Sequence, residues 1–375
     1  MLRAGKHVLC EKPMAATAQQ ARQMFRAAEE NGVVLMEAMR SLYTPGFARL
    51  CGLVQAVGPV RSARIPYAKY SSRYGLVRQG RPTNIFSTEF ATGALMDLGV
   101  YCVNLALGLF GMPKGIQASA VKLPNGADGA GAILARYDDK LVELAYSKIT
   151  DGRLPGEVQG EQGTVLVHHP DEITRLEVLW RDGRREDITV QNPPNNLCGE
   201  VQQFLRLLGG AHGYEAAKGQ TLAALALMDE AQPQAGLHFA ADEASTHRCR
   251  TGGIERMSGR LENSKARNIR LVGLDLDGTV FTDEKTITPA TKDAIARAVR
   301  AGVAVLPVTG RPRSGLPEEV LAIPGVRYAI TSNGPMCADL AERSVLVRLA
   351  PDEDPPLPAL PIHATYDVVL DISIH

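Results

Sequence analysis

The sequence lacks an excess of charge of either sign. Lysine plus arginine number 41 and aspartate plus glutamate also number 41, so no net field favours nucleic acid or an acidic membrane surface. We therefore expect a small-molecule substrate and further subunits as partners, and neither nucleic acid nor a membrane.

Cysteine clusters and long apolar runs are missing as well. The six cysteines are scattered and form no C-x-x-C pair, which argues against a zinc site and favours a reduced, cytoplasmic protein. No apolar run approaches the ~20 residues of a membrane span, and the first residues show no signal-peptide pattern. A chain of 375 residues is long enough for two or three domains.

What the sequence does contain, first, is an alternation of strand, helix and strand. Residues 6–12 read as an apolar strand, Thr17 is placed to cap a helix that stops at Gly32, and residues 33–39 read as the next strand. This rhythm is typical of a parallel sheet with crossover helices. Two strands and one helix cannot cover such a sheet, so partner strands come from elsewhere or these residues are the tail of a longer domain.

The following segment, up to about residue 242, changes to strands broken by turns. Residues 135–147 predict a hairpin, and residues 90–111 are apolar nearly all round, which predicts a buried helix. Helices are also predicted within residues 199–210 and 219–232. The first of these has an apolar stripe at helical spacing, formed by Val201, Phe204, Leu205 and Leu208. An antiparallel sheet with helices on one side fits this α+β segment.

A second strand-helix-strand unit follows a polar linker, residues 243–268. Its strands are predicted at residues 269–277 and 303–310, and Thr288 with Pro289 marks the start of the helix between them. A third strand is predicted from residue 328.

Lys12 directly follows the first predicted strand, and ligands of open α/β sheets bind beyond the carboxyl ends of the strands. Pro13 biases Lys12 toward an extended backbone. Asp97 and Tyr101 are four residues apart and share one face of the buried helix, where a carboxylate needs a partner. These three residues could form one proton-transfer cluster. A solvated lysine and a core tyrosine are the alternatives for each residue taken alone.

Residues 4–15, 93–111 and 228–242 together resemble the Gfo/Idh/MocA oxidoreductases, in particular the glucose-fructose oxidoreductase and dihydrodiol dehydrogenase branch. The resemblance implies the C-terminal remnant of a Rossmann domain over residues 1–42. It also implies an α+β domain over residues 43–242, whose mostly antiparallel open sheet forms a homodimer. The implied reaction is hydride transfer between NAD(P) and a sugar, polyol or diol.

The same resemblance implies roles for single residues. Glu11, Lys12 and Pro13 would bind the cofactor, and Lys12 would also polarise the substrate oxygen. Tyr101 would be the acid/base, and Asp97 would orient the substrate and tune the pair.

The G-x-G-x-x-G loop of this family, which holds the pyrophosphate, is absent from the sequence. Gly129 and Gly131 begin such a pattern, but Leu134 occupies its third position and the segment continues as a strand. We therefore expect the N-terminal half of the Rossmann domain to be missing, together with the residue that chooses between NAD and NADP.

Asp275 and Asp277 stand two residues apart at the end of the strand within residues 269–277, and so on the same side of the backbone. Paired carboxylates there suit a divalent metal, and one of them could attack a phosphoryl group. A surface turn is the alternative.

With residues 308–312 and 331–335, this pair resembles the start of a Cof-type haloacid dehalogenase-like phosphatase, a partial Rossmann-like domain over residues 269–375. The resemblance implies Asp275 as nucleophile, Asp277 as acid/base, Mg²⁺ at both, and phosphate binding by Thr309 and Gly310. The family also needs a later lysine and a later Gly-Asp motif. After Arg311 the sequence has neither, so we expect little phosphatase activity.

Three functions stay open at this point. The first is an NAD(P)-dependent oxidoreductase with an incomplete phosphatase-like appendage. The second is a truncated or chimeric product with little catalysis, and the third is a Mg²⁺-dependent sugar-phosphate phosphatase with a sugar-binding module.

Overall fold

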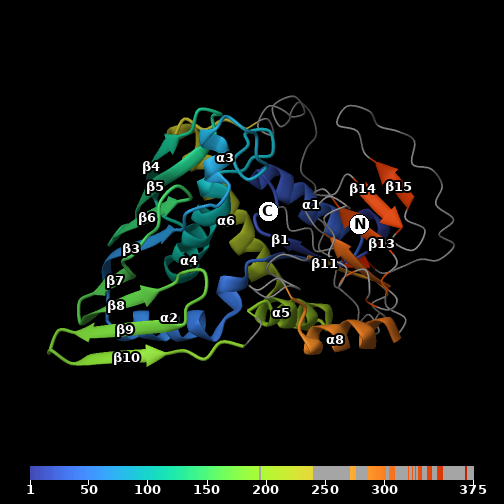
Figure 1. Ribbon diagram of the computed structural model, residues 1–375. Helices are drawn as coiled ribbons and strands as arrows, with labels where there is room; N and C mark the ends of the chain where they lie inside the picture. Colours follow the sequence, from blue (N-terminus) through green and yellow to red (C-terminus); the bar gives the residue numbers. More distant parts are fainter. Residues whose placement is uncertain are drawn as a thin grey trace. The chain divides into compact units, whose positions relative to one another are not determined.

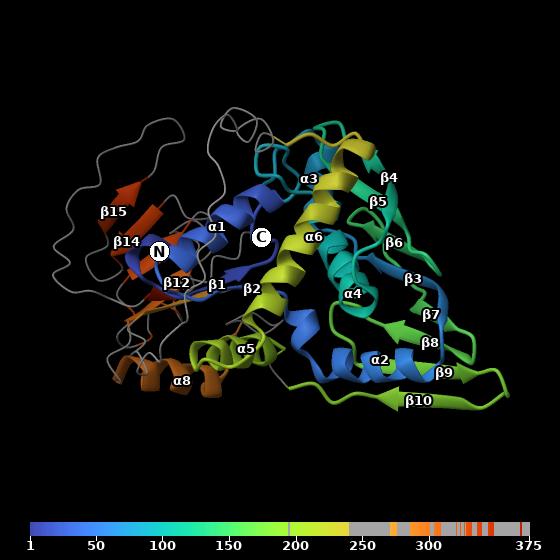
Figure 2. The same ribbon diagram turned by 180° about the vertical axis from the view of Figure 1, so that it is seen from behind.

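The computed structural model describes residues 1–193 and 196–239, and shorter segments beyond them (Figures 1 and 2). The segments are 271–275, 286–300, 304–308, 320, 323, 326, 328–331, 336–339, 344–348 and 368–369. The chain divides into two compact units, one of residues 1–11, 26–35 and 260–375 and the other of residues 12–25 and 36–259. Lys12, Pro13, Asp97 and Tyr101 all belong to the second unit.

The N-terminal strand-helix-strand pattern is confirmed. After a short 3₁₀ turn, η1 (Leu2–Ala4), come β1 (Val8–Glu11), α1 (Ala18–Glu30) and β2 (Leu35–Ala38), and the two strands pair. The backbone N–H of Gln20 donates to the Thr17 hydroxyl over 3.2 Å, which is the predicted cap. Gly32 has a φ of +61°, a conformation that favours glycine after a helix.

An eight-stranded sheet forms most of the second unit, in the order β10-β9-β8-β7-β3-β6-β5-β4. Among these strands β3 and β6 pair in parallel and the other neighbours are antiparallel, so the predicted α+β class with a mostly antiparallel sheet is confirmed. The predicted hairpin is β5 and β6, in which Arg136 pairs with Leu141. The strands are β3 (Val60–Ala68), β4 (Gly115–Lys122), β5 (Asp128–Arg136), β6 (Leu141–Ser147), β7 (Gly156–Gly160), β8 (Gly163–His168), β9 (Arg175–Trp180) and β10 (Arg185–Thr189).

Helices cover this sheet, where α4 packs against α6 and against β3 and β6, while α2 lies along β8 and β9 (Figures 1 and 2). The predicted buried helix is confirmed as a π-helical turn, η3, that continues directly into α4. The helical elements of the unit are η2 (Arg40–Tyr43), α2 (Pro45–Ala56), α3 (Tyr74–Arg78), η3 (Leu95–Gly99), α4 (Val100–Phe110), α5 (Cys198–Leu208) and α6 (Tyr214–Gln234). The homodimer predicted through this sheet stays a prediction.

Helix α5 forms as predicted, but its predicted apolar stripe is only partly buried. Of the stripe residues Phe204 is buried while Val201 and Leu205 are exposed, and the neighbouring Glu200 and Leu207 are buried instead. At the start of α5 the backbone lies close to Tyr43, because a Cβ on Gly199 would be only 2.1 Å from the carbonyl oxygen of Tyr43.

The C-terminal segments form a six-stranded sheet in the order β15-β14-β13-β12-β11-β16. Strands β16, β11, β12 and β13 are parallel, and β14 and β15 are antiparallel. The predicted cap of α8 is confirmed, since the N–H of Thr291 donates to the Thr288 hydroxyl over 3.1 Å. The bounds are β11 (Leu271–Asp275), α8 (Pro289–Arg300), β12 (Ala304–Val308), β13 (Tyr328–Thr331), β14 (Met336–Asp339), β15 (Ser344–Arg348) and β16 (Val368–Val369). No helix among the described residues is long and apolar enough to span a membrane.

Candidate active site

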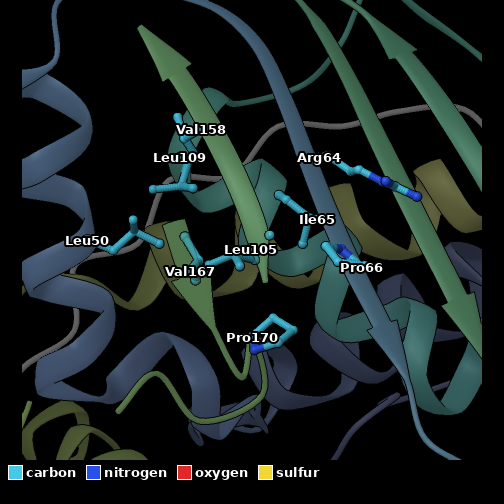
Figure 3. A pocket seen from close by; sticks show the side chains of 10 residues that line it. Leu50, Arg64, Ile65, Pro66, Leu105, Leu109, Val158, Val167 and Pro170 are labelled. Atoms are coloured by element: carbon cyan, nitrogen blue, oxygen red, sulfur yellow. The ribbon is translucent and has the colours of Figure 1, made fainter. Parts of the chain in front are cut away.

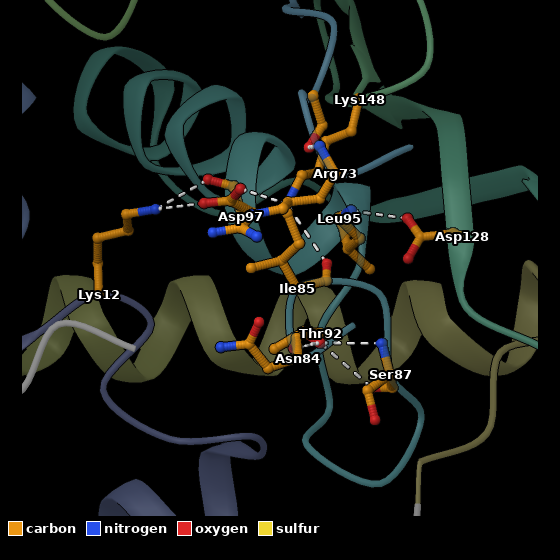
Figure 4. A network of polar contacts seen from close by, with 11 residues as sticks. Lys12, Arg73, Asn84, Ile85, Ser87, Thr92, Leu95, Asp97, Asp128 and Lys148 are labelled. Carbon is orange, nitrogen blue, oxygen red and sulfur yellow. Dashed lines mark hydrogen bonds and ion pairs between the residues drawn. The ribbon is translucent and has the colours of Figure 1, made fainter. Parts of the chain in front are cut away.

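Lys12 leaves the carboxyl end of β1 and makes two contacts with one residue of η3. Its ammonium donates to the Asp97 carboxylate over 2.9 Å and to the Asp97 backbone carbonyl over 3.0 Å (Figure 4). The Lys12 side chain is only 7% exposed, and the Lys12–Pro13 bond is cis. The strand end therefore presents an ammonium group that is fixed by a neighbouring carboxylate rather than solvated.

Asp97 binds a second cation with its other oxygen. The Lys148 ammonium lies 2.6 Å from Oδ2 of Asp97, so one carboxylate bridges two lysines (Figure 4). Burial by itself would raise the pKa of Asp97, but Lys12 and Lys148 together outweigh it and hold that pKa well below its usual range. Asp97 is therefore ionised at every physiological pH.

Lys148 directly follows β6 and is 5% exposed. Its backbone N–H donates to the carbonyl of Gly129 over 2.8 Å, and its ammonium lies 3.4 Å from the carbonyl oxygen of Ile85 and 4.9 Å from the centre of the Phe86 ring. These contacts fix the lysine on the sheet side of Asp97.

Tyr101 lies one turn after Asp97 and is 6% exposed. The Lys12 ammonium sits 4.8 Å from the centre of its ring, and the ring of Tyr67 packs against it edge-on with centroids 5.6 Å apart. The structure thus brings together Lys12, Asp97 and Tyr101, the three residues that spacing had placed in one cluster. Their catalytic roles stay predictions.

Arg40, in η2, adds a third cation on the other side of Tyr101. Its Nε donates to the Tyr101 hydroxyl over 3.3 Å, while its terminal nitrogens lie 3.1 Å from Asp171 and 3.7 Å from Glu172. Burial lowers the pKa of Arg40, but the Tyr101 oxygen and the Asp171 carboxylate outweigh it and raise that pKa further. The guanidinium stays charged beside the tyrosine oxygen.

Asp128, the first residue of β5, approaches the same helical segment from its buried side. Its Oδ2 accepts the backbone N–H of Leu95 over 2.6 Å, and burial raises its pKa to about 6 (Figure 4). The approach requires glycine at position 93, because a Cβ there would lie 1.9 Å from Oδ1 of Asp128. Asp128 therefore caps the start of η3 with an acid that is far easier to protonate than Asp97.

Sequence reasoning missed Lys148 and Arg40, although the signal used for Lys12 was also present for Arg40. Arg40 comes two residues after β2, close to the carboxyl end of a strand of the N-terminal strand-helix-strand unit, where ligands of open α/β sheets bind. Lys148 follows β6 of the mostly antiparallel sheet, to which this rule does not apply. Asp171 carries no such signal, since it lies in the loop between β8 and β9.

The other predicted residues are placed as follows. Glu11 ends β1 as expected, and Asp275 ends β11. Asp277, Thr309 and Gly310 lie outside the described residues. Among the residues that are described, no group of three or more His, Cys, Asp or Glu side chains is suited to hold a metal ion, so Mg²⁺ binding stays a prediction.

A small pocket lies on the helix-covered side of the sheet, and none of the charged side chains of the cluster lines it (Figure 3). Its walls are mainly apolar, formed by residues such as Leu50, Ile65, Leu105 and Val167. Sugars and polyols need convergent hydrogen-bonding groups, which these walls do not supply. The charged cluster around Asp97 and Tyr101 is the better candidate for chemistry.

Comparisons with known proteins agree with the fold. Residues 1–39 match the family model of an oxidoreductase family with an NAD-binding Rossmann fold, and residues 54–166 match the Gfo/Idh/MocA C-terminal domain. Residues 272–354 match a haloacid dehalogenase-like hydrolase.

Two curated relatives and one solved structure illustrate the likeness. The chain is 39% identical over 242 residues to scyllo-inositol 2-dehydrogenase (NADP(+)) IolU of Bacillus subtilis. The aligned region covers 64% of this chain and 74% of the relative. The chain is 29% identical over 257 residues to trans-1,2-dihydrobenzene-1,2-diol dehydrogenase of Danio rerio, covering 64% and 74%. The 3-ketoreductase KijD10 of Actinomadura kijaniata, solved with NADP and TDP-benzene, has the same fold, with a TM-score of 0.55 at 20% identity over 64% of this chain and 73% of that one.

The identity to the inositol dehydrogenase, over nearly three quarters of its length, and the two family models converge on one assignment. This chain belongs to the Gfo/Idh/MocA family of NAD(P)-dependent oxidoreductases.

Proposed function

We propose that this chain takes part in hydride transfer between NAD(P) and a neutral ring compound with adjacent hydroxyl groups, a cyclic polyol or vicinal diol. The observation that carries the proposal is the Lys12 ammonium, which Asp97 holds 4.8 Å above the Tyr101 ring. The names of the two relatives support the substrate class, because an inositol and a dihydrobenzene diol are both six-membered carbon rings with neighbouring hydroxyls.

The charge of the cluster supports a neutral substrate. Its three cations are matched by three carboxylates, and Arg40, the cation nearest the Tyr101 hydroxyl, already faces two of them. A carboxylate or phosphate ligand would have to compete with Asp171 and Glu172 for the guanidinium. A hydroxyl or carbonyl oxygen needs only one hydrogen bond and no compensating charge.

The roles follow from the contacts. Lys12 donates to the substrate oxygen and stabilises the charge that develops on it, and Asp97 holds Lys12 in place. Tyr101 gives its proton to the carbonyl oxygen during reduction, and its phenolate takes the hydroxyl proton during oxidation. Bound NAD(P) supplies the acceptor or donor of the hydride.

The residues present fit one end of that cofactor. Glu11, Lys12 and Pro13 lie at the carboxyl end of a strand, where the nicotinamide end of a dinucleotide binds in open sheets, and Lys12 is held there by two hydrogen bonds. The sequence contains no G-x-G-x-x-G segment for the pyrophosphate.

The test is turnover of NADP⁺ and NAD⁺ by the full chain with scyllo-inositol, trans-1,2-cyclohexanediol and glucose. We expect the cyclic diols to be oxidised, and Tyr101→Phe and Lys12→Met to lose about 10²- to 10⁴-fold in kcat/KM. Tyr70→Phe and Lys114→Met are matched controls at exposed positions and should keep full activity. No turnover by the folded chain, or full activity in Tyr101→Phe, would contradict the proposal.

For residues 269–375 we propose a haloacid dehalogenase-like domain, and the family match over residues 272–354 supports this assignment. Hydrolase activity of this domain is tested by release of phosphate from sugar phosphates that needs Mg²⁺ and disappears in Asp275→Asn.

A further inference from the structure

We propose that Arg40 is a positioning residue for the acid/base hydroxyl of Tyr101, held in place by Asp171 and Glu172 from the loop between β8 and β9. The inference rests on the proposed function, in which Tyr101 moves the substrate proton. It concerns which group orients the Tyr101 hydroxyl before its proton is transferred.

The guanidinium of Arg40 has a different partner at each of its three nitrogens. Nε donates to the Tyr101 hydroxyl over 3.3 Å, one terminal nitrogen donates to Asp171 over 3.1 Å, and the other lies 3.7 Å from Glu172. Because the group is planar and rigid, contacts on all sides fix its position as well as its charge. The Tyr101 oxygen therefore meets a cation whose orientation is set from the loop.

This contact decides where the proton of Tyr101 points. A guanidinium can only donate, so the Tyr101 oxygen is the acceptor and its own O–H must be directed elsewhere. Within the described part of the chain no residue accepts that proton from Tyr101. The proton is thus left for the substrate oxygen.

The same contact stabilises what remains after the proton leaves. A phenolate at Tyr101 would keep the Arg40 donor, and the ring is nearly buried, so water screens the attraction only weakly. Tyr67, the neighbouring phenol, does not compete as the acid. Burial and then the Asp171 carboxylate raise the pKa of Tyr67 well above its usual value.

Direct substrate binding is the competing role for Arg40. It is disfavoured because the guanidinium already faces Asp171, Glu172 and Tyr101. The two roles differ in kinetics, since a substrate ligand mainly raises KM whereas a group that acts through Tyr101 lowers kcat.

A double-mutant cycle separates these roles. We expect Arg40→Met to lower kcat about 10- to 100-fold with little change in KM. Asp171→Asn, which loosens the anchor, should give a smaller loss of the same kind. In a Tyr101→Phe background Arg40→Met should cause no further loss of kcat. Arg61→Met, at an exposed ion pair, is the matched control.

A second measurement does not depend on turnover or on cofactor. The Cζ carbon of ¹³C-labelled Tyr101, assigned by its loss in Tyr101→Phe, is followed by NMR against pH. In Arg40→Met the phenolate signal should appear at higher pH than in the parent chain. The groups that surround this titration are Lys12 and Arg40 at the ring, Tyr67 at its edge, and Asp97, Asp171 and Glu172 behind them.

The outcomes are distinct. Additive losses in the cycle, a loss confined to KM, or an unchanged NMR titration would each overturn the inference about Arg40. Full activity in Tyr101→Phe would instead overturn the proposed function, and the NMR titration would still decide whether Arg40 acts on Tyr101. Fluorescence of Trp180, the single tryptophan, reports whether each variant is folded, and Arg40→Lys replaces Arg40→Met if it is not.

Discussion

Asp97 is part of the helical turn η3 and Asp128 caps the start of the same turn, and their acidities move in opposite directions. Burial pushes the pKa of both upward. At Asp97 two ammonium groups outweigh that push, whereas Asp128 accepts a backbone N–H and its pKa rises to about 6. The number of paired cations, and not burial, separates the permanently charged Asp97 from Asp128, whose pKa of about 6 lets it take up a proton in mildly acidic solution.

The comparison also assigns different tasks to the two carboxylates. Asp97 is 34% exposed and can meet a substrate, while Asp128 is fully buried and holds the start of the helix that carries Asp97. The helical turn η3 is therefore held by the buried carboxylate of Asp128 and carries the partly exposed, charged carboxylate of Asp97. Mutations of the two carboxylates and of their neighbours test this difference between Asp97 and Asp128.

The largest effect is expected for Asp97→Asn, which removes the carboxylate that binds both Lys12 and Lys148. Both lysines are nearly buried, so the free energy of unfolding should fall by about 4 kcal/mol. Urea denaturation at neutral pH, followed by Trp180 fluorescence, measures it. The control is Asp138→Asn, an exposed pair with Lys114 that should cost less than ~1 kcal/mol. Equal losses in both variants would refute the role of paired cations.

Asp128→Asn tests the raised pKa of Asp128 through the pH dependence of stability. Because the folded pKa of Asp128 is raised from 3.8 to about 6, the native state holds a proton that the unfolded state has lost between these values. Its contribution to stability is fully present below pH 3.8 and is lost as the pH rises to about 6, in total about 3 kcal/mol. The stability difference between Asp128→Asn and the parent chain should therefore change across this window in urea titrations. A difference that is constant with pH would mean that Asp128 titrates normally.

Gly93→Ala tests the position of the Asp128 carboxylate without changing Asp128 itself. The new Cβ would lie 1.9 Å from Oδ1, so backbone or carboxylate must shift, and we expect a loss of about 2 kcal/mol. Gly75, inside α3, is the control, because a Cβ added there would meet no atom within 4 Å. Gly75→Ala should be neutral or stabilising by up to ~1 kcal/mol. Matching Tm values for the two variants would show that the turn tolerates displacement of Asp128.

Much of this fold could be predicted because its signals are local. Thr17 and Thr288 cap their helices, Gly32 ends one, and the hairpin of β5 and β6 follows from alternation around a turn. Which residues of α5 are buried could not be predicted, because this depends on contacts between segments far apart in sequence, such as the close approach of Gly199 to Tyr43.

The candidate site divides in the same way. Lys12 was predictable from a strand end, and Asp97 and Tyr101 from helical spacing. Asp171 and Arg40 are 131 positions apart in sequence, and they come into contact only through the tertiary fold. The residues proposed to carry the chemistry therefore follow from local sequence pattern, whereas Asp171, which holds Arg40, is found only from the tertiary structure.

The smallest effect on stability is expected for Lys148→Met, and it sharpens the contrast most. Methionine fills the space of the lysine, and Asp97 keeps its pair with Lys12, so the free energy of unfolding at neutral pH should change by no more than about 1 kcal/mol. The pKa of Asp97 should nevertheless rise, because one of its two cations is gone. A lowered folded pKa gives stability that is present above the unfolded value and lost as the pH falls through the folded one, so this loss should begin at higher pH in the variant. NMR of the ¹³C-labelled Asp97 carboxyl measures the shift, Lys148→Arg should keep the parent titration, and an unchanged titration in Lys148→Met would mean that Lys12 alone holds Asp97 ionised.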